Sequence, residues 1–305
     1  MASLSFDGRV AVVTGAGRGL GRAYAMLLAE RGARVVVNDL GGSMEGDGAD
    51  SEPAALVAAA IGASGGTAVA DTSDVADPAG AAALVGRAVE EFGRIDVVLN
   101  NAGIMQWAGL PEVDVEALGR HLAVHVLGSF NTTRAAWPHM TAQRYGRIVM
   151  TTSTGLLGLP ENTAYATAKA AVVGLTRSAR LAGARKGIKV NCIAPAAYTR
   201  MAGRGTDDDD PMATAMAPEL VAPMAAYLAH EDCPVSGEIY TAGAGRFARL
   251  FIASTEGYVH RGARPPTMED VAGQWDTIND EGDYFVPSDL MAWSRAFLAH
   301  LQGGG

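Results

Sequence analysis

The chain has 305 residues, a formal net charge of −9 and a sequence pI near 5.1. Hydrophobic residues make up 49% of it and the mean hydropathy is +0.11, which is typical of a globular chain rather than a disordered one. The acidic balance argues against a nucleic-acid-binding surface, since contacts to phosphate need a basic face.

The two cysteines, Cys192 and Cys233, give neither a metal-ligand spacing nor a disulfide framework, and we interpret both as small core residues. Residues 1–7 carry no apolar signal segment, and no apolar run is long enough to cross a bilayer. Residues 302–305 carry no peroxisomal S-K-L signal. We therefore expect a cytoplasmic protein with no metal, no membrane segment and no nucleic-acid partner.

The first pattern along the chain is a strand, a glycine-rich turn and a helix. Residues 9–14 form an apolar, β-branched run, residues 14–21 read Thr-Gly-Ala-Gly-Arg-Gly-Leu-Gly, and residues 22–31 have a helical pattern. This context is typical of a pyrophosphate site, because the free amides and the dipole at a helix start favour an anion. The candidate binding residues at this turn are Gly15, Arg18, Gly19, Leu20 and Gly21.

A second strand is predicted at residues 34–38, and Asp39 follows it. A carboxylate at this distance from the glycines can accept hydrogen bonds from both hydroxyls of an adenosine ribose. Residues 41–51 are rich in glycine and acidic residues, which predicts a surface loop.

Strands and helices alternate through the rest of the first 245 residues. Periodic segments predict helices at residues 53–63, 78–92, 115–140 and 163–185. Apolar runs predict strands at residues 95–99 and 147–152. This alternation predicts an α/β fold, a Rossmann-type doubly wound parallel sheet with helices on both faces. Residues 203–211, which include four consecutive aspartates, predict an exposed loop.

Tyr165 and Lys169 lie four residues apart in the helix predicted over residues 163–185, so both side chains project from one face. An ammonium beside a phenol lowers the pKa of the phenol from about 10. The pair therefore predicts a proton donor and acceptor that works near neutral pH, although such pairs also occur by chance.

Together these motifs resemble the short-chain dehydrogenase/reductase family. The glycine turn, Asn100-Asn101-Ala102-Gly103 and the Tyr165/Lys169 pair match family motifs in order, and the resemblance covers residues 5 to about 245. It implies hydride transfer between a bound nicotinamide and a secondary alcohol or ketone. It also implies cofactor contacts by Tyr165, Lys169 and nine further residues: Asp74, Val75, Asn101, Ala102, Gly103, Pro195, Ala197, Tyr198 and Thr199.

The resemblance further implies that Ser153 steadies the substrate oxygen, that Tyr165 transfers the proton, and that Lys169 lowers the pKa of Tyr165 and holds the nicotinamide ribose. The usual spacing from the tyrosine points to Thr152 instead. We prefer Ser153, because strand geometry fixes which side chains face a site and a loop absorbs a deletion. His125 stands where many members carry an Asn, and it is either part of a proton relay or a helix histidine with satisfied hydrogen bonds.

The choice of cofactor depends on two neighbouring residues. Asp39 would repel a 2′-phosphate and favours NAD. Arg18 occupies a position where NADP-using members of the family often carry a base. Because a carboxylate beside a phosphate dianion is the costlier arrangement, we expect NAD, with NADP left open.

A narrower resemblance concerns residues 36–42, 134–140, 145–150 and 193–195. These segments are similar to the (3R)-hydroxyacyl-CoA dehydrogenase units of type 2 peroxisomal multifunctional enzymes, which are also hydroxysteroid dehydrogenases. The similarity implies a 3-hydroxyacyl-CoA/3-oxoacyl-CoA or steroid-type substrate. The alternatives are reduction of another carbonyl, such as a 3-oxoacyl-carrier-protein thioester or a small ketone, and a catalytically silent NAD-binding regulatory protein.

Residues 1–245 are the expected catalytic domain, and residues 246–305 are the expected C-terminal extension. In the extension, residues 246–252 and 256–260 predict a hairpin. Thr267 predicts the cap of a helix that ends near residue 278, and Ser288 predicts the cap of a last helix. Such a tail cannot form its own core, so we expect it to dock on its own subunit or a neighbour. The family resemblance implies a homodimer or homotetramer.

Overall fold

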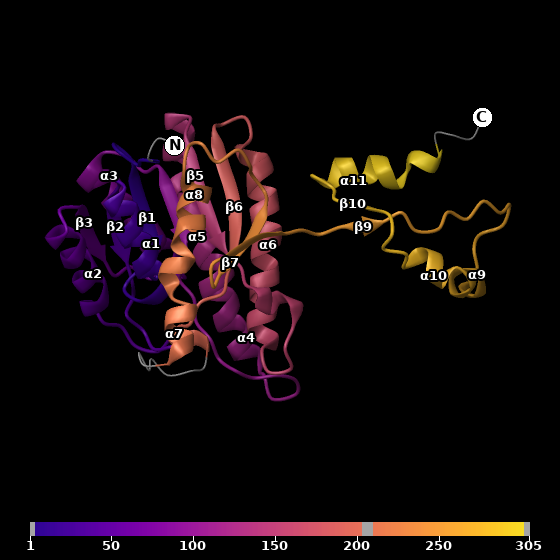
Figure 1. The fold of residues 1–305 in the computed structure, drawn as a ribbon, viewed down its shortest axis with the longest axis horizontal. Helices are drawn as coiled ribbons and strands as arrows, with labels where there is room; N and C mark the ends of the chain where they lie inside the picture. The colour runs from indigo at the N-terminus through magenta and orange to yellow at the C-terminus, as the bar shows by residue number, and fades with distance from the viewer. Residues whose placement is uncertain (1–3, 203–209, 302–305) are drawn as a thin grey trace. The chain divides into compact units, whose positions relative to one another are not determined.

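The computed structural model describes residues 4–202 and 210–301, and the expected acidic loop at residues 203–209 lies outside them (Figure 1). The chain divides into two units, Met1–Arg249 and Leu250–Gly305. The division lies four residues beyond the predicted boundary at residue 245.

An eight-stranded sheet forms the centre of the first unit, with the strand order β3-β2-β1-β4-β5-β6-β7-β8. The strands are β1 (Val10–Thr14), β2 (Arg34–Asn38), β3 (Thr67–Asp71), β4 (Val97–Asn100), β5 (Gly146–Thr151), β6 (Ile188–Pro195), β7 (Ile239–Gly243) and β8 (Arg246–Leu250). Neighbouring strands from β3 to β7 pair in parallel. The central strands β1, β4 and β5 are buried along their whole length, as expected of parallel strands covered on both faces.

Helices cover both faces of this sheet (Figure 1). They are α1 (Gly19–Glu30), α2 (Glu52–Ala63), α3 (Pro78–Phe92), α4 (Val115–His121), α5 (Gly128–Gln143), α6 (Thr163–Gly183), α7 (Pro211–Ala215) and α8 (Ala222–Ala229). α1 contacts α2 and α8, while α3 contacts α5. The predicted doubly wound parallel sheet is therefore confirmed. α1 begins at Gly19 rather than at residue 22, because the last glycines of the turn form its first turn.

The helix predicted over residues 115–140 is present as a continuous helical run to Gln143, but it is not one regular α-helix. A π-helical segment, η1 (Leu122–Leu127), separates α4 from α5 and contains the buried His125. A π-helical turn adds one residue to the helical repeat, so the side chains on either side of it change direction. The apolar pattern continues through it, which is why the sequence pattern predicts one helix.

The hairpin predicted between residues 246–252 and 256–260 is wrong. β8 pairs with β7 at the edge of the main sheet, across a two-residue turn in which Ala244 and Gly245 have φ values of 49° and 72°. Two positive φ values are typical of the tight turn that joins twisted antiparallel strands. The segment after it contributes β9 (Ser254–Thr255), which pairs antiparallel with β10 (Tyr284–Phe285).

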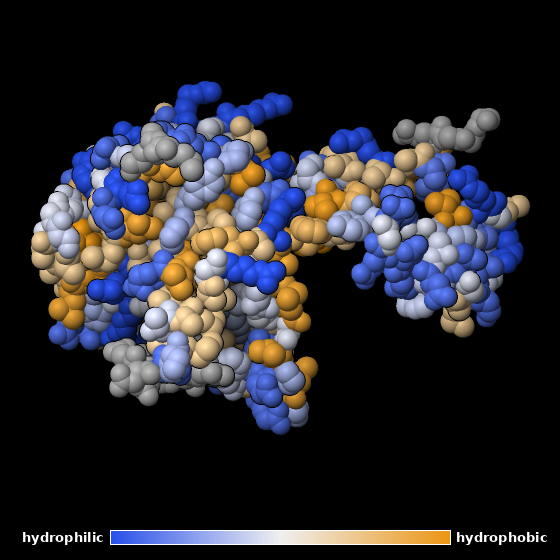
Figure 2. Space-filling model, in the orientation of Figure 1, coloured by the Kyte–Doolittle hydropathy of each residue, from blue (hydrophilic) through white to orange (hydrophobic). Residues whose placement is uncertain are grey.

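The second unit contains α9 (Met268–Gly273), α10 (Trp275–Ile278), α11 (Leu290–Phe297) and the short η5 (Ala299–Leu301). The predicted cap at Thr267 is confirmed and forms a capping box with Asp270. The last helix is capped by Asp289 instead of Ser288. No residue between 250 and 301 is buried, and apolar side chains reach the surface of this unit (Figure 2). Docking of the tail on a subunit stays a prediction.

None of the helices in the described part of the chain is long and apolar enough to cross a membrane.

Candidate active site

A cavity of about 340 Å³ opens where the strand order reverses, at the carboxyl ends of β1, β2 and β4. Ligands of open parallel sheets bind at such a point. The cavity is lined by thirteen of the predicted cofactor residues: Gly15, Arg18, Gly19, Leu20, Gly21, Asp39, Asp74, Val75, Asn101, Ala102, Gly103, Tyr198 and Thr199. Pro195, Ala197, Tyr165 and Lys169 are not among its lining residues.

The glycine turn is packed so tightly that side chains would not fit. A Cβ on Gly21 would lie 2.1 Å from the carbonyl oxygen of Gly15, and a Cβ on Gly15 would lie 2.8 Å from the Cα of Ala102. The Asn101 side-chain amide donates to the carbonyl oxygens of Thr14 and Gly15, at 3.0 Å each. Asn101 therefore holds the end of β1 against the segment that follows β4.

The start of α1 has the features expected of an anion site. Its N-cap residue, Arg18, makes no capping hydrogen bond with its side chain, and the first turn carries no acidic residue. The first backbone amides belong to Gly19, Leu20 and Gly21, which line the cavity. Unpaired amides and the positive end of the helix dipole at this place suit a diphosphate.

Asp39 is held in place by the backbone. Its Oδ2 accepts a hydrogen bond from the Gly17 N–H at 2.7 Å, and its Oδ1 accepts one from the Gly41 N–H at 2.8 Å. A Cβ on Gly17 would lie 2.8 Å from Oδ2, so glycine at this position keeps the carboxylate where it is. Each carboxylate oxygen has a second lone pair, which can accept from a ligand hydroxyl.

Sequence reasoning missed a second set of cavity residues. These are Asn38, Leu40, Gly42, Ser43, Gly46, Ser73, Ile104, Val124, Arg200 and Met201. Three of them, Gly42, Ser43 and Gly46, belong to the segment of residues 41–51 that was expected to be a surface loop. Its glycine content was the available signal, since glycine allows a backbone to approach a ligand closely.

Tyr165, Lys169 and Ser153 come together beside the cavity. The side chains of Ser153 and Tyr165 are hydrogen-bonded. The Nζ of Lys169 lies 5.4 Å from the centre of the Tyr165 ring and donates to the Thr151 carbonyl oxygen at 2.8 Å. Thr152 is fully buried, and its hydroxyl donates to the Lys169 carbonyl oxygen at 2.6 Å. The hydroxyl that reaches Tyr165 therefore belongs to Ser153, and that of Thr152 is used by the backbone of α6.

Burial controls the acidity of this group. It raises the pKa of Tyr165 above its usual value of 10, and the hydrogen bond with Ser153 opposes the rise. Burial also lowers the pKa of Lys169 to about 8. The expected net lowering of the Tyr165 pKa is thus not found in this structure, because burial raises this pKa by more than the hydrogen bond with Ser153 lowers it.

Two stacked histidines flank Tyr165. The rings of His121 and His125 are 5.9 Å apart, and the His125 ring meets Tyr165 edge-on at 5.4 Å. His121 uses both nitrogens, with Nδ1 on the Ala117 carbonyl oxygen and Nε2 accepting from the Gln106 N–H. The sequence analysis did not single out His121, although its spacing of four from His125 places both on one helix face.

His125 differs from His121 because one of its nitrogens lacks a partner. Nε2 lies 2.9 Å from the Ile104 carbonyl oxygen, whereas the buried Nδ1 has no hydrogen bond. Burial lowers the pKa of His125 well below 6.5, and the nearby Lys169 ammonium lowers it further. The imidazole is therefore neutral. A Cβ on Gly103 would lie 2.6 Å from His125 Cε1, so His125 packs directly behind a residue that lines the cavity.

Of the four aspartates in the acidic segment, Asp210 lies within the described residues. It caps α7, and its Oδ2 accepts a hydrogen bond from the Tyr198 hydroxyl at 3.1 Å. Among the residues that the structure describes, no group of three His, Cys, Asp or Glu side chains could hold a metal ion.

Comparison with known proteins gives consistent relatives. The sequence profile of the family described as short chain dehydrogenase matches residues 9–210. Peroxisomal multifunctional enzyme type 2 of Drosophila melanogaster is 42% identical over 280 residues, which are 91% of this chain and 46% of that enzyme. A short-chain type dehydrogenase/reductase of Mycobacterium tuberculosis is 43% identical over 275 residues, covering 89% of this chain and 94% of that protein.

Among solved structures, full-length peroxisomal multifunctional enzyme type 2 from Drosophila melanogaster aligns with a TM-score of 0.81 at 34% identity. The alignment covers 98% of this chain and 50% of that one. A short chain dehydrogenase from Mycobacterium avium aligns with a TM-score of 0.78 at 36% identity, covering 90% and 97% of the two chains. The chain thus spans about half the length of the multifunctional enzyme and nearly the full length of the mycobacterial protein.

Proposed function

We propose that this chain, which belongs to the short-chain dehydrogenase/reductase family, is an NAD-dependent oxidoreductase of secondary alcohols and ketones. The observation that carries the proposal is the placement of Tyr165. Its ring packs on His125, which packs behind Gly103 at the wall of the cavity, and its hydroxyl is hydrogen-bonded to Ser153.

The residues of the cavity fit a dinucleotide. The free amides at the start of α1 would hold the diphosphate, and Asp39 would accept from the adenosine ribose. Asp74 and Val75 would contact the adenine, and Tyr198 and Thr199 would contact the nicotinamide half. A bound nicotinamide would supply or take the hydride. Asp39 favours NAD over NADP in this proposal, because its fixed carboxylate would repel a second anion.

Tyr165 handles the proton in this mechanism. Because burial raises its pKa, the hydroxyl is protonated at neutral pH and can donate to the oxygen of a ketone as negative charge develops there. Ser153 would hydrogen-bond the same oxygen and stabilise that charge. Lys169, whose pKa is about 8, keeps a positive charge near Tyr165 at neutral pH and steadies the phenolate left behind.

His125 is the proposed next member of the proton path. When Nε2–H donates to the Ile104 carbonyl oxygen, the free Nδ1 of this neutral imidazole can accept a hydrogen bond in a proton relay, which a histidine with both nitrogens engaged cannot. We expect His125→Leu to lower kcat about tenfold, with a larger solvent deuterium effect, and His125→Asn to lower it less. If both variants match the wild type, His125 serves packing alone.

The proposed substrate is a 3-hydroxyacyl-CoA/3-oxoacyl-CoA pair or a steroid-type alcohol. Support comes from the similarity to peroxisomal multifunctional enzyme type 2 and from the residues that resemble its dehydrogenase unit. Other carbonyls, such as 3-oxoacyl-carrier-protein thioesters or small ketones, are the alternative. A homodimer or homotetramer and a cytoplasmic location are part of the same proposal, and the exposed Phe130 and Leu181 offer apolar surface on α5 and α6.

The test is a spectrophotometric assay of the purified chain with NAD or NADH against acyl-CoA, carrier-protein and steroid substrates. We expect Tyr165→Phe to lower kcat by a factor of about 100 to 10,000, because the variant lacks the transferred proton. NADH affinity, measured by fluorescence, should stay within about threefold. Near-normal turnover of Tyr165→Phe would overturn the assignment. Binding of NADH without turnover of any substrate would instead support a silent NAD-binding regulatory protein.

A further inference from the structure

The segment of residues 41–51, here called the β2–α2 loop, is a closed unit of its own. The Asp50 N–H donates to the Leu40 carbonyl oxygen at 2.9 Å and ties the two ends together. Inside the loop, the Ser43 N–H donates to the Asp47 carbonyl oxygen at 2.8 Å. Loops whose ends are joined in this way are compact.

The inner side of the β2–α2 loop lines the cavity through Gly42 and Gly46, among others. Its outer end reaches the segment after β4 on the other side of the cavity. The Met44 carbonyl oxygen accepts from the Met105 N–H at 2.8 Å. A Cβ on Gly46 would lie 2.9 Å from Cγ2 of Ile104, so the loop backbone packs closely on the Ile104 side chain there. The loop therefore spans the cavity.

Arg200 joins the β2–α2 loop to a third side of the cavity. It lies in the connection that follows β6, and it donates from Nη1 and Nη2 to the Gly42 carbonyl oxygen at 3.3 and 3.4 Å. Arg200 is half-buried and close to Arg18, and both the burial and this like charge lower its pKa. The carboxylates of Asp39 and Glu45 oppose this lowering and favour the charged guanidinium, and Glu45 belongs to the β2–α2 loop.

We propose that Arg200 is a positioning residue whose bond to Gly42 latches the β2–α2 loop across the cavity and slows the release of a bound dinucleotide. Arg200 acts through the loop in this account and takes no part at the reacting atoms. The identity of the retained ligand rests on the proposed function, whereas the latch itself does not.

The latch can be tested without a ligand, by hydrogen exchange of the full chain. Arg200→Met should raise the exchange rates of the β2–α2 loop amides, with that of Asp50 among them, about tenfold. Arg200→Lys should restore part of the protection, because an ammonium can donate to the same carbonyl. Arg185→Met, which changes an exposed arginine, is the control and should leave the loop unaffected. Unchanged exchange in Arg200→Met would overturn the latch.

The second test measures the release of NADH by stopped-flow fluorescence. Arg200→Met should raise the dissociation rate about tenfold. A chain in which residues 43–48 are replaced by two glycines should release NADH equally fast, and adding Arg200→Met to it should change nothing further. If Arg200→Met still raises the NADH dissociation rate tenfold in the shortened chain, Arg200 contacts the cofactor directly and the proposal is overturned. If the wild type binds neither NADH nor NADPH, the proposed function fails and the exchange experiment alone decides on the latch.

Discussion

The Nζ of Lys169 lies 5.4 Å from the centre of the Tyr165 ring, and its hydrogen bond goes to the carbonyl oxygen of Thr151 at the end of β5. The ammonium is thus held by the sheet, one helical turn from the phenol. Lys169 is buried and Tyr165 is partly buried, and burial shifts both away from their charged forms. The pH dependence of activity and of stability follows from this pair.

The first prediction concerns the rate of alcohol oxidation. In this direction Tyr165 must accept a proton, so it works as the phenolate, and its raised pKa makes the phenolate scarce at neutral pH. We expect kcat for oxidation to rise steadily between pH 6 and 9, since each step in pH increases the phenolate fraction. Ketone reduction uses the protonated phenol and should not rise over this range. Parallel profiles in the two directions would contradict this role of Tyr165.

The second prediction concerns stability. Burial lowers the pKa of Lys169 from 10.5 to about 8, so between these values the unfolded chain binds a proton that the folded chain does not. Stability therefore rises with pH in this window, by about 2 kcal/mol between pH 7 and 9.5. Lys169→Met removes the titrating group. Urea unfolding at the two pH values should show the rise in the wild type and a smaller or absent rise in the variant.

Much of the fold could be predicted because parallel strands buried on both faces are short apolar runs, as in β1 and β4. The π-helical segment around His125 could not be predicted, because one added residue in a helix hardly changes the apolar pattern of the sequence. The partner of β8 could not be predicted either. A strand's neighbour depends on contacts with the finished sheet, and the turn at Ala244 and Gly245 carries only part of that information.

At the site, the motifs predicted the residues that touch the cavity from nearby glycine turns and strand ends. They could not predict Arg200, whose partner Gly42 is 158 residues away in the sequence. The choice between Thr152 and Ser153 likewise depended on distance along a strand. In the structure the hydrogen bonds of the two hydroxyls decide between them, because the Thr152 hydroxyl donates to the backbone of Lys169. Long-range contacts of this kind leave no local pattern.

The third prediction concerns the choice of cofactor. Asp39→Ser removes the fixed charge that would repel a 2′-phosphate and leaves Arg18 beside the glycine turn. The ratio of kcat/KM for NAD over NADP should fall about a hundredfold. Asp39→Ser also removes the hydrogen bonds to the Gly17 and Gly41 amides. Any loss of kcat/KM from this change is shared by NAD and NADP, so it cancels in the ratio. Asp232→Ser changes an exposed carboxylate that does not line the cavity, and its ratio should equal that of the wild type.

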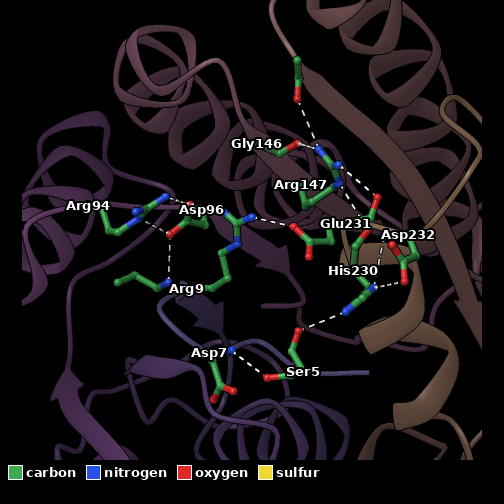
Figure 3. Close-up of polar contacts among 12 residues, drawn as sticks. Ser5, Asp7, Arg9, Arg94, Asp96, Gly146, Arg147, His230, Glu231 and Asp232 are labelled. Carbon is green, nitrogen blue, oxygen red and sulfur yellow. Dashed lines mark hydrogen bonds and ion pairs between the residues drawn. The ribbon is translucent and has the colours of Figure 1, made fainter. Parts of the chain in front are cut away.

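The last prediction concerns the opposite end of the sheet, where Asp96 precedes β4 (Figure 3). Its side chain is fully buried and lies 2.6 Å from Arg94 and 3.3 Å from Arg9, and it also accepts from the Val10 N–H. Arg9 continues to Glu231 at 2.7 Å, but the Glu231 side chain is 54% exposed. The buried Asp96 carboxylate therefore binds both arginines, whereas the Glu231 carboxylate is an exposed partner of Arg9 at the edge of the cluster.

Asp96→Asn keeps the shape of the side chain and removes the charge, which leaves Arg94 without its counterion and Arg9 with Glu231 alone. We expect the free energy of unfolding to fall by about 3 kcal/mol, as when one partner of a buried pair is lost. Glu231→Gln is the matched control and should cost less than about 1 kcal/mol, because water replaces an exposed partner. NADH affinity should be unchanged in both, since the cluster lies at the amino ends of strands whose carboxyl ends form the cavity. Equal losses of stability in the two variants would show that burial of Asp96 does not set the strength of this cluster.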